Sequence, residues 1–228
     1  MSVVVLGLVA AALLAASLVH RYQRYKAQQR AQIRRLASAI PLIDESMGEL
    51  GPVPLSQPLR VMLRGDVVDR YRTIRNIHKA YPQIDKQLQQ AQGKLSSEGP
   101  AVADSVPPIE DEGQRNRLCA ALERLVEFLE RGGPISHHRT EERLQFIREL
   151  KERRAEVMAR YHIVSANRLA DQGDTRHAAQ HLHSLMTWLL QQGPNTDFVR
   201  ALYAEAETQH HQLLSARMAP AEEEAGAA

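Results

Sequence analysis

The chain has 228 residues, enough for one medium-sized domain and a separate anchoring segment. Hydrophobic residues make up 43 % and aromatic residues only 4 %, so a core must be built mainly from aliphatic side chains, which suits the packing of helix against helix. The single cysteine, Cys119, excludes an internal disulfide and gives no reason to expect an oxidising compartment.

Positive charge is concentrated in one short stretch, although the net charge is only +2. No Lys, Arg, Asp or Glu precedes Arg21, and no acidic residue precedes Asp44. Six of the 29 basic residues lie between Arg21 and Arg35, and the other 23 are outnumbered by 27 acidic residues. The chain beyond this stretch therefore lacks the basic face of a nucleic-acid-binding domain, and no nucleic-acid partner is expected. The six cations of this stretch, the basic collar, are Arg21, Arg24, Lys26, Arg30, Arg34 and Arg35.

The stretch before the collar is uncharged and predicts a transmembrane anchor at residues 1–20. Its uncharged residues run to Val19 and would form about 28 Å of helix, close to the thickness of a hydrocarbon core. A cleaved signal peptide is the alternative, with Ala15, Ala16 and Ser17 as a cleavage site, but no basic residue precedes the apolar stretch. Cations directly after it predict that the N-terminus lies outside and the following domain lies in the cytoplasm.

The segment 21–50 is predicted to be a basic juxtamembrane helix. Tyr22 and Tyr25 stand where interfacial aromatic residues are found. The collar is positioned to contact anionic lipid head groups. The alternative is that it only reflects the orientation of the helix in the membrane and binds no particular lipid. Pro41 predicts a kink or a restart of this helix. Apolar residues that continue the helical spacing are Ile33, Leu36, Ile40, Ile43 and Met47.

Residues 58–95 carry the clearest periodicity, a heptad pattern typical of a coiled coil. Arg70 interrupts it once, and Pro82 predicts a kink or a helix restart near Tyr81 that keeps the register. The partner of this seam is either another helix of the same chain or a second copy, which would make a homodimer. The predicted interaction seam consists of Leu63, Val67, Ile74, Ile77, Tyr81, Ile84, Leu88 and Leu95.

Residues 96–113 are acidic and rich in Pro and Gly, which predicts a flexible linker. A helical bundle is expected over 114–218, with a long helix from Thr140 to about Asp171. The Arg-rich face of that helix alternates with acidic residues and is interpreted as solvated. The tail, 219–228, is expected to be disordered.

The hairpin over 162–190 resembles a tetratricopeptide unit. Ala166 and Leu169 precede a Gly-Asp turn, and Ala178, Leu182 and Leu185 follow it with the small-and-large spacing of that family. The resemblance implies an antiparallel helix pair. A generic helix pair has the same spacing, and a second copy of the unit is not apparent in the sequence.

The chemistry-bearing residues form no complete motif, so neither a catalytic site nor a cofactor is expected. Cys119 follows a core leucine and is interpreted as a small buried residue. Gly93-Lys94 lacks the upstream glycine and the preceding strand of a phosphate-binding loop. Arg64-Gly65-Asp66 matches an adhesion tripeptide, but it falls within a helical pattern and is interpreted as a chance match. Five histidines could be brought together by two antiparallel helices, but no carboxylate or cysteine stands at ligand spacing, so they are interpreted as solvated or interfacial residues and no metal site is expected. They are His177, His181, His183, His210 and His211.

These observations predict an all-α protein: one transmembrane helix followed by an antiparallel helical bundle with a coiled-coil-like segment. The expected function is that of a membrane-anchored cytoplasmic scaffold or adaptor. It would bind membrane lipid and a protein partner at the inner membrane of a bacterium, since Arg outnumbers Lys 24 to 5, as in GC-rich genomes. The alternatives are an envelope-side helical protein released by signal cleavage, or an enzyme with an unrecognised site.

Overall fold

Seven helices and no strand make up the part of the chain that the computed structural model describes. That part comprises residues 2–99, 104–131, 133–135 and 140–225, with side chains described from 17 to 215 within those ranges. The predicted all-helical bundle is confirmed at this level. The helices are α1 (Ser2–Glu49), α2 (Gln57–Ile77), α3 (Ile84–Ser96), α4 (Glu112–Glu130), α5 (Thr140–Asp171), α6 (Thr175–Gln192) and α7 (Asp197–Ala225).

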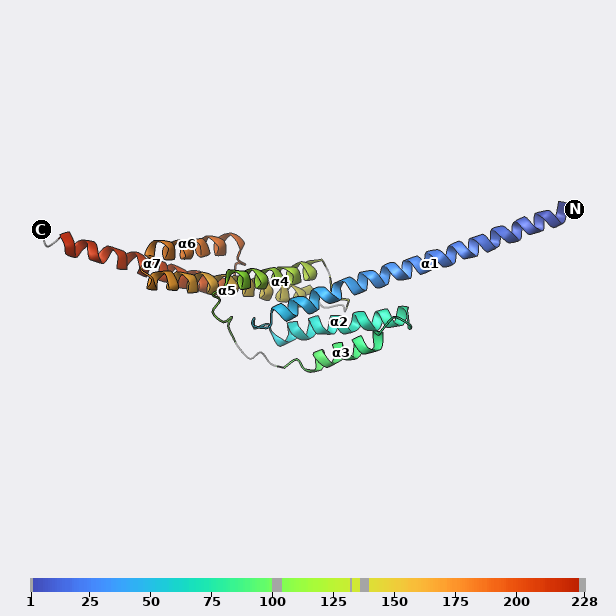
Figure 1. Ribbon diagram of the computed structural model, residues 1–228, viewed down its shortest axis with the longest axis horizontal. Helices are drawn as coiled ribbons and strands as arrows, with labels where there is room; N and C mark the ends of the chain where they lie inside the picture. The colour runs from blue at the N-terminus through green and yellow to red at the C-terminus, as the bar shows by residue number, and fades with distance from the viewer. Residues whose placement is uncertain (1, 100–103, 132, 136–139, 226–228) are drawn as a thin grey trace.

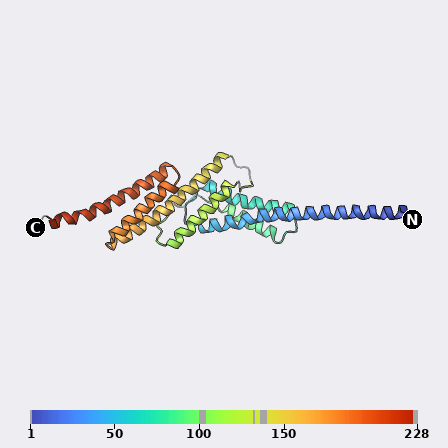
Figure 2. The ribbon, with the colours of Figure 1, turned by 90° about the horizontal axis from the view of Figure 1, so that it is seen from above.

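The molecule is elongated, and its two termini lie at opposite ends (Figures 1 and 2). The N-terminal part of α1 extends away from the other helices, whereas its C-terminal part packs against α2 and α4. The expected helix restart at Pro41 is wrong, because α1 continues through this residue. Burial of Ile40 and Ile43 on either side of Pro41 offsets the hydrogen bond that a proline removes.

Two hydrophobic clusters share α5. The first is built from α1 to α4 and the N-terminal half of α5, and the second from the C-terminal half of α5 with α6 and α7. The first cluster therefore continues across the segment 96–113, which was expected to be a flexible linker. Val106 and Ile109 of that segment are buried in the first cluster, because an apolar side chain gains free energy when it leaves water. Residues 100–103 lie outside the described part.

A new helix begins near Tyr81, which is the restart and not the kink of the two expected alternatives. The new helix α3 turns back along α2, so the two form an antiparallel hairpin (Figure 1). Helix α2 ends at Ile77, and the chain reverses through His78 to Gln83, where Gln83 adopts a left-handed backbone conformation with φ of 58°. Pro82 lies in this turn and lacks the N–H that a continuing helix requires. The heptad spacing survives because α2 and α3 each present one apolar stripe to the same core.

The Arg-rich face of α5 is not simply solvated, which corrects the sequence interpretation. Glu149 accepts hydrogen bonds from the N–H and the hydroxyl of Ser56, at 2.5 and 2.7 Å, and so holds the start of α2. Glu156 is buried and accepts the N–H of Val106 at 2.9 Å. Both carboxylates attach loops of the first cluster to α5, an arrangement that helical periodicity does not reveal.

The C-terminal helices follow the sequence expectation more closely. Helix α5 has the predicted bounds, and the turn to α6 contains Gly173 with φ of +81° and Asp174, which accepts the N–H of His177 at 3.2 Å. Helix α7 extends to Ala225, beyond the predicted start of the disordered tail. The Ala- and Glu-rich composition there favours a helix. Residues 226–228 lie outside the described part.

Within the described part of the chain, no helix combines the length and the apolar character that a membrane crossing requires. The predicted anchor occupies residues 1–20, and the side chains of residues 1–16 lie outside the described part.

Candidate functional site

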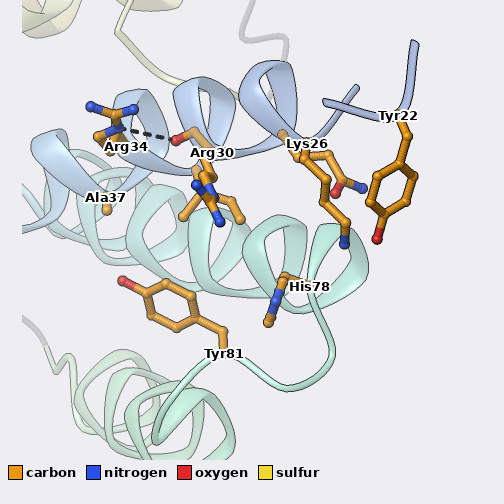
Figure 3. A pocket seen from close by; sticks show the side chains of 9 residues that line it. Tyr22, Lys26, Arg30, Arg34, Ala37, His78 and Tyr81 are labelled. Atoms are coloured by element: carbon orange, nitrogen blue, oxygen red, sulfur yellow. Dashed lines mark hydrogen bonds between the residues drawn. The ribbon is translucent and has the colours of Figure 1, made fainter. Parts of the chain in front are cut away.

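A groove lies between α1 and the turn that joins α2 to α3 (Figure 3). Its volume is about 560 Å³, within the range of small-molecule sites. Lys26 and Arg30 extend from α1 toward the turn, which contributes His78 and Tyr81. The groove exists because α2 runs back along α1 and brings its last turn beside the basic collar (Figure 1).

The groove is positively charged and rich in hydrogen-bond donors. No Asp or Glu is among the described residues that line it. Lys26 and Arg30 can only donate, whereas the hydroxyls of Tyr22 and Tyr81 and the imidazole of His78 can donate as well as accept. The Lys26 ammonium lies 5.6 Å from the ring centroid of Tyr22, which orients this cation at one end of the groove. Buried Ile33 provides an apolar wall.

Only half of the basic collar lines this groove. Lys26, Arg30 and Arg34 do so, although Arg34 points away from the turn and donates its Nε–H to the carbonyl of Arg30 at 3.4 Å (Figure 3). The other three cations of the collar, Arg21, Arg24 and Arg35, are exposed outside it. The sequence identified the cations, but it contained no signal that His78 and Tyr81 would join them.

The predicted interaction seam lies inside the chain. All eight of its side chains pack in or against the first hydrophobic cluster, and none is exposed. Leu63, Val67 and Ile74 come from α2, and Ile84 and Leu88 come from α3. Apart from Tyr81, which is partly buried and also lines the groove, the seam is therefore not available as a free surface in this conformation.

Arg70, the one interruption of the seam, is buried in an ion pair that the sequence analysis missed. Its Nε–H donates to Asp66 at 2.7 Å, and the Asp66 side chain is 0 % exposed. Asp66 also accepts the N–H of Ile135 at 2.6 Å, and Arg70 donates to the carbonyl of Gly133. The pair thus joins α2 to the segment between α4 and α5. The signal available in the sequence was the spacing of four residues between Asp66 and Arg70.

The five histidines do not gather into one cluster. His177 pairs with Asp174 at 2.6 Å, whereas His181 lies next to His162 of α5, with 3.3 Å between the two Nδ1 atoms. His183 and His210 form a separate contact, with 6.4 Å between ring centroids. Among the described residues, no three His, Cys, Asp or Glu side chains come together in a way that could hold a metal ion.

The contact between His162 and His181 disfavours protonation. Burial lowers the pKa of His162 to about 4, and the nearby His181 and Arg115 act in the same direction. Burial also lowers the pKa of His181. One Nδ1 must donate to the other, so the contact requires at least one neutral imidazole. This pair stabilises the packing of α5 against α6 in its neutral form.

We expect His162 to make the protein less stable in mild acid. Its folded pKa lies below the unfolded value of 6.5, so the unfolded chain binds the proton more readily and stability is lost as pH falls from about 6.5 to 4. The loss is at most about 1.4 kcal/mol per pH unit for one proton. Melting temperatures across this range should fall less steeply for His162→Phe than for the parent. The exposed control His183→Gln should keep the parent slope, and equal slopes for all three proteins would contradict the prediction.

Cys119, which was interpreted as a small buried residue, is half-buried in the structure. The side chain packs against the first hydrophobic cluster, and burial raises the pKa of its thiol to about 11. The thiolate, which is the reactive form, is therefore scarce near neutral pH.

Comparison with protein-family models, with curated proteins and with solved structures gives no match for this chain.

Proposed function

We propose that this protein is a single-pass membrane protein whose N-terminal helix presents a helical interaction module to the cytoplasm. The observation that carries the proposal is the continuity of α1, which runs without a break from the uncharged stretch into the core of the module. The part of α1 that leaves the other helices carries exposed apolar side chains where they are described, with Leu18 at 66 % and Val19 at 55 % exposure. Such a helix finds an apolar environment in a lipid bilayer.

The order of residues along α1 supports the proposed orientation. Leu18 and Val19 are followed by exposed Tyr22 and Tyr25 and then by the rest of the basic collar. This order matches a helix that leaves the hydrocarbon, crosses the head-group layer and enters a compartment that retains positive charge. The bulk of the chain is therefore proposed to lie on the cytoplasmic side of the inner membrane.

A surface at the junction of α6 and α7 supports the interaction role. Leu190 near the end of α6 is 72 % exposed and lines a groove of about 600 Å³ together with Pro194, Val199 and Tyr203. Exposed apolar surface of this kind often marks a contact with another protein. Because the heptad seam is internal, a protein partner of the module needs a surface such as this one.

Extraction and topology experiments test the anchor. In alkaline carbonate the full chain should stay with the membranes and should be released only by detergent, with its N-terminal residues intact. A cytoplasm-dependent reporter fused to the C-terminus should be active, and an export-dependent one should be silent. Recovery of a shortened chain in the soluble envelope fraction would instead support signal cleavage and overturn the proposed anchor.

Site-specific photocrosslinking in intact membranes tests the interaction surface. A crosslinking residue in place of Leu190 should give a discrete adduct with another protein. The same residue in place of Gln180, which is exposed on the same helix, should not. Equal adducts at both positions would indicate random collisions and would argue against a partner surface around Leu190.

A further inference from the structure

The groove beside α1 has the chemistry of an anion site. Cationic groups from α1 meet polar groups from the turn between α2 and α3, and no described acidic residue lies among them. Lys26 and Arg30 cannot accept a hydrogen bond, so the ligand that matches them must supply oxygen acceptors and negative charge. A phosphate group supplies both, and Arg and Lys are the usual cations of phosphate sites.

The position of the groove along α1 indicates the source of the phosphate. Tyr22 and Lys26 follow Val19 by three and seven residues, or about 4.5 and 10.5 Å along a helix. The head-group layer extends about 5–8 Å beyond the hydrocarbon. If α1 is anchored as proposed above, Tyr22 at the outer end of the groove lies at the level of the lipid phosphates. The backbone of Lys26 and of Arg30, about 10.5 and 16.5 Å beyond Val19, lies deeper in the cytoplasm, so their long side chains have to extend back toward the membrane to meet a lipid phosphate. The turn from α2 to α3 then faces the membrane surface, because α2 runs antiparallel to α1 (Figure 1).

The size and walls of the groove also favour a lipid over a free ion. About 560 Å³ is far more than a phosphate ion fills, and Ile33 and Ala37 add apolar surface beside the cations. A glycerophospholipid presents a phosphate next to an apolar glycerol ester region, and it would contact both kinds of wall. A free phosphate would use only the polar one.

We propose that the groove between α1 and the α2–α3 turn binds the head-group phosphate of an anionic phospholipid. Lys26 and Arg30 neutralise the phosphate, His78 donates to its oxygens from the turn, and Tyr22 flanks it at the interface, whereas the Tyr81 hydroxyl points away from Lys26, toward the side of Ala37 (Figure 3). The site rests on the proposed membrane anchor. It differs from a general attraction of the basic collar to the membrane because only some of the collar's cations take part.

The collar provides a charge-matched control for this distinction. Lys26→Gln/Arg30→Gln removes two cations from the groove, and Arg21→Gln/Arg24→Gln removes two cations from outside it. General electrostatic attraction predicts the larger loss for Arg21 and Arg24, because they lie nearer the membrane. A specific groove predicts the larger loss for Lys26 and Arg30. The two explanations therefore order the variants oppositely.

Titration of the full chain in a neutral detergent, followed by native mass spectrometry, tests the site. The parent should retain one phosphatidylglycerol molecule saturably, with an affinity at least about tenfold higher than for phosphatidylcholine, as one charge-assisted contact provides. Lys26→Gln/Arg30→Gln should lose this preference. In Arg21→Gln/Arg24→Gln the ratio of the two affinities should change by less than about threefold, which corresponds to less than about 1 kcal/mol. His78→Phe should weaken binding measurably, since the turn contributes to the site.

Three results would overturn the proposal. They are equal binding of both lipids, equal losses in the two double variants, and displacement of phosphatidylglycerol by inorganic phosphate at equal concentration, which would make free phosphate the ligand. Circular dichroism of each variant serves as the control that it remains helical. The anchor itself is tested separately by carbonate extraction: a membrane-bound parent without lipid preference refutes the groove alone, and a soluble parent refutes the anchor.

Discussion

Replacing Asp66 by Ala should lower the free energy of unfolding by about 3–5 kcal/mol, because it leaves the buried guanidinium of Arg70 without its carboxylate. The same change removes the acceptor of the Ile135 N–H and loosens the segment that follows α4. Chemical denaturation of the full chain, followed by circular dichroism, measures the loss.

Two further variants separate the buried charge from other effects. Arg72→Ala breaks the exposed ion pair with Asp69 on the same helix and should cost no more than about 1 kcal/mol. Asp66→Leu combined with Arg70→Met removes both charges and should recover the part of the loss that comes from the unpaired guanidinium. It should not recover the part that comes from the Ile135 N–H, which still lacks its acceptor. If Asp66→Ala proved as stable as Arg72→Ala, the buried pair of Asp66 and Arg70 would contribute little to the free energy of unfolding.

Replacing Ile74 by Asp should abolish cooperative unfolding. Ile74 is buried in the first hydrophobic cluster, and an unpaired carboxylate there costs several kcal/mol. That cost is comparable with the whole stability of a domain, which is about 5–15 kcal/mol. Thermal denaturation of the full chain in detergent should show a broad, shallow transition in place of a cooperative one.

Val61→Asp is the matched control, because Val61 lies on the same helix but is exposed. It should change stability by less than about 0.5 kcal/mol. A second outcome concerns the alternative partner of the seam. If Ile74→Asp stays helical and cooperative but changes from a dimer to a monomer on size exclusion, the seam packs between two copies and the intramolecular packing is wrong.

Helix content was predictable from this sequence because it depends on local chemistry. Aliphatic residues at three- and four-residue spacing predict an apolar stripe wherever it packs, and Gly173 with Asp174 predicts a turn from backbone freedom and capping alone. For the same reason the bounds of α5 agreed with the sequence. The charge order that separates residues 1–20 from the collar is likewise a property of the chain and not of its fold.

The partners of these stripes were decided by tertiary structure. A heptad spacing is the same whether the chain continues past Pro82 or turns back there, so the hairpin of α2 and α3 could not be distinguished from a longer coiled coil. The direction of α2 relative to α1 then brings His78 and Tyr81 beside Lys26, although these residues are distant in the sequence. The burial of Arg70 was also decided by tertiary structure. In the sequence this residue only interrupts the seam, whereas in the fold Asp66 and the Gly133 carbonyl surround it. Periodicity predicts which residues lie on one face of a helix, but the free energy of burying them depends on the neighbours that only the folded chain supplies.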